Sequence, residues 1–197
     1  MLSIKYDLGR NDWKMKIIEF NKENVKEEEI EMRVEKSRGI ILNSQGKALI
    51  VKHAGLYMLP GGRVEQETPR EALKREIMEE AGIFNIECKN EPFLKIRSYD
   101  RDYYTRKLGR SITRLTETYF YFGETSEDID LHRQRLTQSE KETEFLVEFE
   151  NLSTIRYLAE TNKTENRKIV YFNRELFTAL DQFASLRRNE KEELERA

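Results

Sequence analysis

The pattern of apolar and polar residues predicts β-strands along six stretches of the chain, and the first of these begins with clear alternation of apolar and polar residues. These stretches are residues 13–20, 32–42, 47–52, 91–99, 113–124 and 144–152. Asn43 and Gly46 predict a turn between the second stretch and the third. A charged segment, 21–31, joins the first two stretches as a loop or a short helix. A basic, aromatic segment, 100–112, is expected to form a long loop between the fourth stretch and the fifth.

A complete set of helix signals stands between the third stretch and the fourth. Thr68 is a good N-cap, and Pro69 fits the first helical position, where a missing N–H costs nothing. Glu71 follows Thr68 by three residues and completes a capping box. Gly82 can take the left-handed conformation that ends a helix. The sequence therefore predicts a helix over residues 69–81.

The predicted helix carries an apolar stripe that should face the core, with three glutamates beside it. The stripe consists of Leu73, Ile77, Ala81 and, just past the end of the helix, Phe84. Glu76, Glu79 and Glu80 border this stripe, and like charges at such spacing destabilise a helix. A hard cation such as Mg²⁺ or Mn²⁺ would reverse that effect, because it takes oxygen ligands. On the three glutamates alone, however, an ordinary solvated face explains the pattern better than a metal site.

A second helix is predicted at the end of the chain, over residues 173–197. Its apolar stripe consists of Leu176, Phe177, Leu180, Phe183 and Leu186, and a charged tail follows. Strands thus outnumber helices, and the helices come late. This order predicts one α/β domain of the α+β kind, with a mixed sheet covered by helices.

The composition narrows the range of partners. The chain has 197 residues, of which 38% are apolar and 37% charged, with 35 basic and 37 acidic residues and a net charge of −2. This balance argues against general nucleic-acid or membrane-surface binding. No apolar run approaches the roughly 20 residues that span a bilayer, and the N-terminus lacks the apolar run of a signal peptide, so a cytoplasmic protein is expected. The single cysteine, Cys88, excludes an intrachain disulfide and a cysteine-cluster zinc site.

The segment from Gly61 to Ile83 resembles the signature of a known family. It reads GGRVEQETPREALKREIMEEAGI, and all nine specified positions of the Nudix box, G-x5-E-x7-R-E-U-x-E-E-x-G-U, are matched. The resemblance implies the Nudix fold, a mixed β-sheet sandwiched between helices. It divides the chain into a Nudix hydrolase domain over 31–197 and an N-terminal extension over 1–30. The strand of this extension is expected to pack on the domain or to be swapped between subunits.

The resemblance also implies an activity and a set of site residues. Nudix hydrolases cleave the diphosphate bridge of a nucleoside diphosphate linked to another group, a nucleotide-type small molecule, with Mg²⁺ or Mn²⁺. By position, Glu76, Glu79 and Glu80 resemble the metal ligands, and the carbonyl of Gly61 resembles a further ligand. Arg75 and Glu67 resemble the pair that braces the loop against the helix.

The loop before the helix departs from the family pattern. Family members commonly read P-G-G-x-U-E-x-G-E, whereas this chain reads PGGRVEQE from Pro60 to Glu67. The glycine that usually precedes the last glutamate is absent, so a tighter loop is expected. The shorter loop affects which backbone carbonyl would reach the metal and in which direction Glu65 and Glu67 point. The carboxylates of the helix are not affected.

Residues outside the box are candidates for further roles. Family members often supply one more catalytic glutamate late in the chain, and here Glu140, Glu142 and Glu144 are available. Each alone is explained as well or better by a solvated acidic loop, and Glu144 is preferred because it lies nearest the last predicted strand. Substrate-binding candidates are Arg63, Arg97 and Tyr99, through phosphate contacts and base stacking.

Two other functions on the same fold remain open at this point. A nucleotide sensor or binding module without turnover usually shows an eroded box, and here the box is intact. An isomerase acting on isoprenoid diphosphates would need a reactive cysteine, and Cys88 stands in no reactive context. A homodimer that uses the strand around Trp13 is expected only by analogy with the family.

Overall fold

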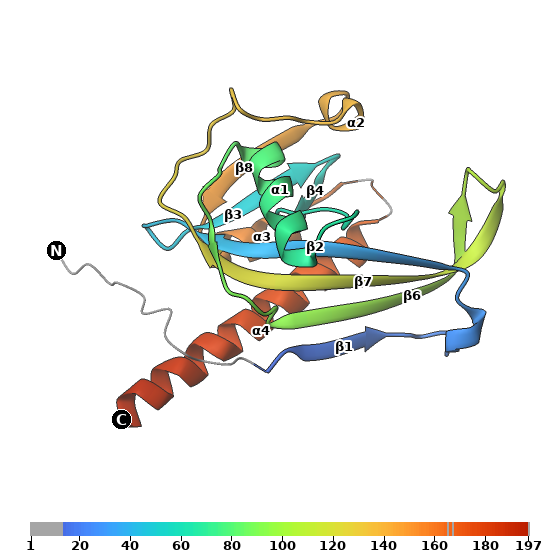
Figure 1. Ribbon diagram of the computed structural model, residues 1–197, viewed down its shortest axis with the longest axis horizontal. Helices are drawn as coiled ribbons and strands as arrows, with labels where there is room; N and C mark the ends of the chain where they lie inside the picture. Colours follow the sequence, from blue (N-terminus) through green and yellow to red (C-terminus); the bar gives the residue numbers. More distant parts are fainter. Residues whose placement is uncertain (1–13, 165, 167, 197) are drawn as a thin grey trace.

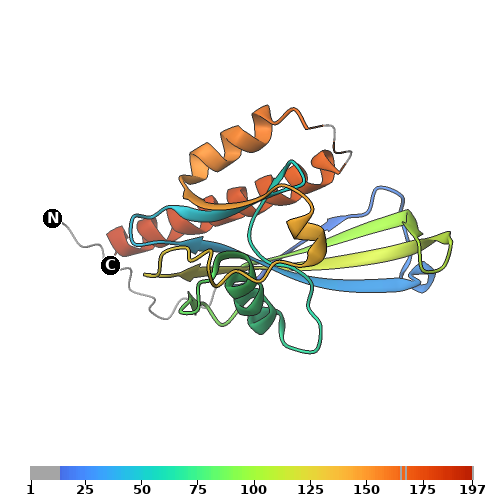
Figure 2. The ribbon, with the colours of Figure 1, turned by 90° about the horizontal axis from the view of Figure 1, so that it is seen from above.

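The computed structural model, which describes residues 14–164, 166 and 168–196, is built around one mixed β-sheet between two helical layers. Helix α1 covers one face of the sheet, and α3 and α4 cover the other (Figures 1 and 2). The mixed sheet and its helices agree with the fold class that the sequence predicts. No helix within the described ranges is long and apolar enough to cross a bilayer.

The strands are β1 (Lys16–Phe20), β2 (Met32–Leu42), β3 (Ala48–His53), β4 (Leu56–Met58), β5 (Glu87–Cys88), β6 (Leu94–Thr105), β7 (Arg110–Glu124) and β8 (Phe145–Glu150). The helices are α1 (Pro69–Ala81), α2 (Gln138–Lys141), α3 (Leu152–Thr161) and α4 (Ile169–Arg196), with a 3-10 turn at Glu27–Glu29. The sheet runs in the order β1-β6-β7-β2-β3-β4, while β5 pairs with β7 and β8 pairs with β3.

The sheet opens between β2 and β3, and this opening positions the glycine loop. β2 pairs with β7 in parallel along its whole length, from Met32 to Leu42, but it pairs with β3 only at Leu42. The backbone edge of β2 that β3 leaves free needs other partners, because unpaired buried peptide groups are costly. The loop over residues 59–64 supplies them and lies against this edge.

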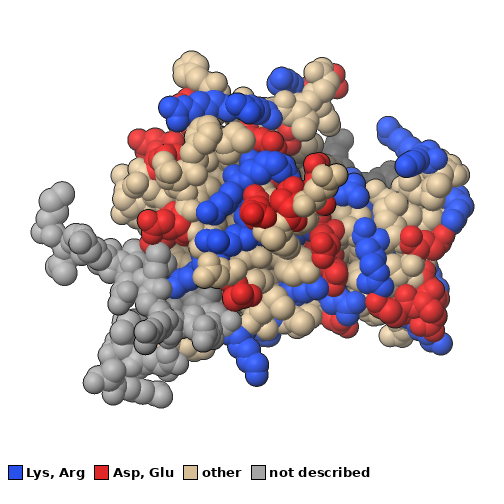
Figure 3. All heavy atoms as spheres, viewed as in Figure 1, with Lys and Arg blue, Asp and Glu red and all other residues tan. Residues whose placement is uncertain are grey.

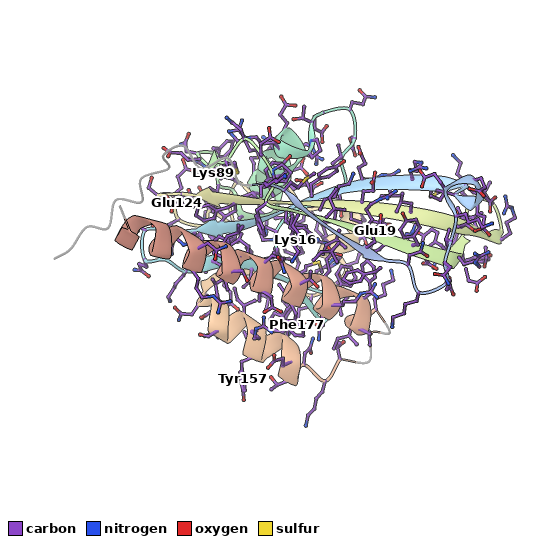
Figure 4. The ribbon with its side chains drawn as sticks, turned by 90° about the horizontal axis from the view of Figure 1, so that it is seen from below. Lys16, Glu19, Lys89, Glu124, Tyr157 and Phe177 are labelled. Atoms are coloured by element: carbon purple, nitrogen blue, oxygen red, sulfur yellow. The ribbon has the colours of Figure 1, made fainter. Side chains whose placement is uncertain are left out.

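Each face of the sheet has its own apolar core. On one face, Leu73, Ile77 and Ala81 of α1 are fully buried against Ile41 of β2, as the helix pattern predicts. On the other face, the C-terminal stripe packs against the centre of the sheet: Leu176, Leu180 and Phe183 are buried, while Phe177 and Leu186 are partly buried. Figure 4 shows Phe177 on the α3 side of α4, whereas Tyr157 points away from the sheet.

Phe84 does not belong to the core, contrary to the prediction from the stripe. Half of its surface is exposed, at 51%, and it lies under the guanidinium of Arg133. Gly82 is the reason, because its left-handed conformation, with φ at 68°, turns the chain away from the helical direction. Ile83 then takes the buried place, with no exposed surface.

The segment over residues 100–112 is not a long loop. β6 and β7 continue through it as a hairpin, with a register shift between Asp100 and Tyr103 and a tight turn that ends at Gly109. This hairpin extends beyond the helices (Figures 1 and 2). Its basic residues bind the acidic connection between β1 and β2: Arg101 pairs with Glu29 and Arg110 pairs with Glu31. An arm that is not covered by a helix lacks the apolar alternation that marks a half-buried strand.

The N-terminal strand is shorter than expected, and the late helices are more extensive. β1 pairs in parallel with β6 of the same chain, Lys16 opposite Leu94, and Trp13 lies outside the described residues. The homodimer and the swapped strand remain predictions. α4 begins at Ile169, earlier than the stripe predicts, and α3 was not foreseen.

Two glycines with the same left-handed backbone provide a stability test. A Cβ on Gly82 would lie 2.1 Å from the backbone oxygen of Asp130, whereas nothing lies within 4 Å of a Cβ on Gly109. Gly109→Ala should cost only the backbone penalty, about 1–2 kcal/mol of unfolding free energy. Gly82→Ala should cost clearly more, because the clash is added. Urea unfolding of both variants measures the difference. Equal losses of unfolding free energy would show that the backbone at Asp130 moves away from the new Cβ without cost.

Candidate active site

The glycine loop is fastened to β2 by backbone hydrogen bonds. The N–H of Ser37 donates to the carbonyl of Gly62 at 2.9 Å, and that of Gly39 donates to the carbonyl of Pro60 at 3.1 Å. Gly61 has a φ of 126°, and a Cβ there would lie 2.1 Å from the oxygen of Ser37. Only glycine allows this close approach of two backbones.

Helix α1 begins with the predicted cap. The hydroxyl of Thr68 accepts from the N–H of Glu71, and the carboxylate of Glu71 accepts from the N–H of Thr68 at 2.9 Å. Both ends of the capping box are therefore formed, and the helix begins at Pro69 and ends at Ala81 as predicted.

A segment that the sequence analysis missed closes the other end of α1. The last carbonyls of a helix need donors from outside it. Here the backbone carbonyls of Glu79 and Ala81 accept hydrogen bonds from the N–H groups of Arg135 and Asp130. The backbone carbonyl of Glu80 accepts one from the side-chain amide of Gln134. The residues over 130–135 thus hold the end of the helix that carries the glutamates, and they lead directly into α2. No local signal in the sequence pairs these two segments.

The three glutamates of the helix point at the glycine loop or at Arg75. Glu80 is buried, and its Oε2 accepts a hydrogen bond from the N–H of Gly61 at 3.0 Å. Glu76 lies close to Gly62: a Cβ atom added to Gly62 would lie 2.3 Å from Oε1 of Glu76. Glu79 accepts from Nη1 of Arg75 at 3.2 Å.

Arg75 joins the glycine loop to α1. Its guanidinium contacts the carboxylate of Glu67 at 2.8 Å, the carbonyl of Arg63 at 2.9 Å and the carboxylate of Glu76 at 2.9 Å. Burial alone would lower the pKa of Arg75, but its hydrogen bonds to Glu67 and Glu76 raise it above the usual range. Five donors in one planar group allow this sharing between loop and helix.

Glu67 also closes the tight loop that lacks the usual glycine. Its carboxylate accepts from the N–H of Glu65 at 3.5 Å and from that of Gln66 at 3.3 Å. The hydrogen bond from Arg75 holds the pKa of Glu67 below its ordinary value. A charged acceptor therefore satisfies the backbone of the turn without a further residue.

The arrangement concentrates negative charge where water is scarce. Burial raises the pKa of Glu80 to about 8, and repulsion by Glu76 and Glu140 adds to this effect. Burial also raises the pKa of Glu76, which Arg75 partly offsets. As the side chains stand, no group of three or more His, Cys, Asp or Glu residues in the described part of the chain is gathered closely enough to hold a metal ion.

The donors nevertheless suit a hard divalent cation. They are carboxylate and carbonyl oxygens, the ligands that Mg²⁺ and Mn²⁺ prefer. Nη1 of Arg75 binds the carboxylates of both Glu76 and Glu79, at 2.9 and 3.2 Å, and so occupies the place between these two candidate ligands. The buried carboxyl of Glu80, with its raised pKa, would be neutralised by a cation instead of by a proton.

Of the three late glutamates, Glu140 is the one near this cluster. Its charge raises the pKa of both Glu76 and Glu80, in addition to the larger effect of burial. Glu144 is exposed, and its carboxylate pairs with Nζ of Lys52 at 2.8 Å. The catalytic role expected of Glu144 stays a prediction, and Glu140 becomes a second candidate because its charge acts on Glu76 and Glu80.

The three substrate-binding candidates lie in different surroundings. Arg63 is exposed on the glycine loop. Arg97 lies on β6, where it pairs with Glu19 of β1 and with Glu117 of β7, and its guanidinium lies 5.4 Å from the ring of Tyr99. Arg97 and Tyr99 thus form part of the ionic contacts within the sheet.

The surface around α1 carries both signs of charge. Basic and acidic side chains are interspersed over this face, without one large basic patch (Figure 3).

The titration of Glu80 predicts how the metal-free protein responds to pH. A carboxyl whose pKa is raised to about 8 in the folded state stays protonated there, while the unfolded chain releases this proton near pH 4.5. The folded state then binds more protons than the unfolded state, so unfolding free energy falls as the pH rises from 5 to about 8. Glu80→Gln should remove this part of the slope. Denaturant unfolding in chelator-treated samples measures it, and an unchanged slope in the variant would contradict the assignment.

The family model described as NUDIX domain matches residues 32–171, which is more than half of the chain. None of the curated proteins matches the sequence.

Solved structures resemble this one at low sequence identity. The MutT protein of Methanosarcina mazei Go1 has 16% identity and a TM-score of 0.47, over 77% of this chain and 95% of that chain. A binary complex of the Ap4A hydrolase of C. elegans has 15% identity and a TM-score of 0.48, over 79% and 98%. The NUDIX domain of Shewanella oneidensis NrtR, complexed with ADP ribose, has 16% identity and a TM-score of 0.44, over 67% and 81%. Such distant likenesses say nothing about the substrate of this chain.

The match of the family model, together with the complete box on a capped helix beside a glycine loop, identifies the chain as a member of the Nudix family.

Proposed function

We propose that the protein is a hydrolase that cleaves the diphosphate bridge of a nucleoside diphosphate linked to another group, with Mg²⁺ or Mn²⁺. The observation that carries the proposal is the position of Glu80. A buried carboxylate accepts a hydrogen bond from the N–H of Gly61, and Glu76 lies against Gly62 in the same loop. In their charged state, carboxyl groups buried this close together are unfavourable unless they bind a cation.

The residues that would hold the ion are Glu76, Glu79 and Glu80, with the carbonyl of Gly61. When bound, the ion would screen the charge of the diphosphate and increase the acidity of water at the site. Arg75 and Glu67 fix the loop relative to the helix, so that the distance between the helix carboxylates and the Gly61 carbonyl is kept constant.

Glu140 is our candidate for the general base. Its charge acts on Glu76 and Glu80, and its carboxylate caps the N-terminus of α2, accepting from the N–H of Thr137 at 2.7 Å. As a carboxylate, it would accept the proton of the attacking water. Arg63, exposed on the glycine loop, is our candidate for a contact with the substrate phosphates. The roles of Arg97 and Tyr99 at the substrate stay predictions.

The cysteine chemistry of an isomerase is not favoured. Cys88 is buried, and burial raises the pKa of its thiol to about 11. The reactive thiolate is therefore scarce near neutral pH.

Removing the helix carboxylates should abolish turnover. In Glu79→Gln and Glu80→Gln we expect kcat to fall at least ~100-fold, because charge stabilisation by the bound ion is lost. Thermal unfolding should stay the same or improve, because repulsion between the carboxylates is relieved. A nucleotide panel with Mg²⁺ or Mn²⁺ and product masses measures the activity. Glu65→Gln, in the exposed part of the loop, is the control that should stay active.

Three glutamates within five residues allow a matched test of the base. Glu140→Gln keeps an acceptor for the cap of α2 but removes the base, so kcat should fall about 100-fold or more. Glu142→Gln and Glu144→Gln should stay near the activity of the wild type. Loss of activity in Glu144→Gln alone would restore Glu144 as the base.

A nucleotide sensor without turnover remains the alternative function. Binding of nucleotide by the wild type, measured by calorimetry with Mg²⁺, and no product from any substrate in the panel would favour it.

A further inference from the structure

Three consecutive residues of β2 bind four consecutive carbonyls of the glycine loop. The backbone N–H groups of Ser37 and Gly39 bind the carbonyls of residues 62 and 60. The guanidinium of Arg38, between them, donates through Nη1 to the carbonyl of residue 59 and, at 3.4 Å, to that of residue 61. Backbone and side chain thus alternate along the loop, and every carbonyl from residue 59 to 62 has a donor.

Arg38 is itself held by the C-terminal helix. Its Nε donates to Oε1 of Glu175 in α4 at 3.2 Å, and only 7% and 5% of the two side chains are exposed. Phe172 of α4 lies 5.9 Å from the guanidinium. Leu176, the next residue after Glu175, is buried in the core of that face. This packing fixes the position of α4, and with it the position of the Glu175 carboxylate.

The N–H and the carbonyl of Gly61, which belong to successive peptide groups, therefore face different elements. Its carbonyl, the candidate metal ligand, faces Arg38, while its N–H donates to Glu80 of α1. A chain of contacts runs from Glu175 through Arg38 to Gly61 and on to Glu80. It joins the helix on one face of the sheet to the candidate metal site on the other.

Stability alone does not explain the pair. Burying two opposite charges costs about as much as their attraction returns, and apolar replacements of similar volume are often neutral or stabilising. Oε2 of Glu175 also has no hydrogen-bond partner among the described residues, although it is buried. A purely structural contact would be made better by apolar side chains, whereas a planar guanidinium is suited to fixing two carbonyls in direction.

We propose that Arg38, held by Glu175, is a positioning residue that sets the orientation of the Gly61 carbonyl, and that the C-terminal helix thereby sets the affinity of the site for its divalent ion. The inference rests on the proposed function, because it concerns the same metal site. It assigns Arg38 no contact with substrate or with the reacting atoms.

The experiment measures Mn²⁺ binding without substrate, by the loss of the free Mn²⁺ signal in electron paramagnetic resonance. Arg38→Lys keeps the charge but loses the planar fork. The double variant Arg38→Met with Glu175→Leu removes both charges at similar volume, so it should stay folded. Both should bind Mn²⁺ about 10- to 100-fold more weakly than the wild type, as do other losses of groups that orient metal ligands.

A second pair in the sheet serves as the matched control. Lys95 and Glu117 form an ion pair with 16% and 15% of their side chains exposed, on strands β6 and β7. Lys95→Met with Glu117→Leu should leave Mn²⁺ affinity unchanged, even where unfolding free energy changes. Circular dichroism establishes that each variant is folded.

The outcomes separate this inference from the function on which it rests. Wild-type affinity in both folded Arg38 variants would overturn the role of Arg38, and so would an equal loss of affinity in the control. If the wild type bound no Mn²⁺, the proposed function would fail, and this inference with it.

Discussion

The edge of β2 that faces away from β7 is the constraint on which the site depends. Because β3 pairs with β2 only at Leu42, the peptide groups before that residue need other partners. The glycine loop meets this need, and Gly61 is the residue whose missing side chain permits the contact. The carboxylates of α1 then approach a backbone that is already held, so their geometry follows from the pairing of the sheet.

The three helix glutamates are placed by two effects of different range. Local capping by Thr68 and Gly82 sets where α1 begins and ends, and this decides which residues share a face. The core on that face then fixes the rotation of the helix through Leu73 and Ile77. Together these contacts push Glu80 into a place without water, at a cost that its hydrogen bond to Gly61 only partly offsets.

Contacts between segments far apart in sequence explain where the predictions from the sequence differ from the structure. Phe84 follows the apolar period of α1, but the turn at Gly82 removes it from the helical face. The hairpin over residues 100–112 lacks apolar alternation because no helix covers it, and its charges are paired by the segment after β1, far away in sequence. Residues 130–135 bind the end of α1 and lead into α2, which carries Glu140, and no spacing in the sequence records this contact.

The sequence by itself determined the helix, its caps, the carboxylate face and the brace between Arg75 and Glu67, because all of these arise within 22 consecutive residues, Gly61 to Gly82. Local hydrogen bonds and helical periodicity decide such features before the chain folds. Only the tertiary structure decided which late glutamate lies near the box and which arginine holds the glycine loop. Arg38 reads in sequence as one of several charged residues in its strand, and Glu175 as one charge on a helix. They meet across 137 residues because the sheet opens beside β2 and α4 closes the face beneath it.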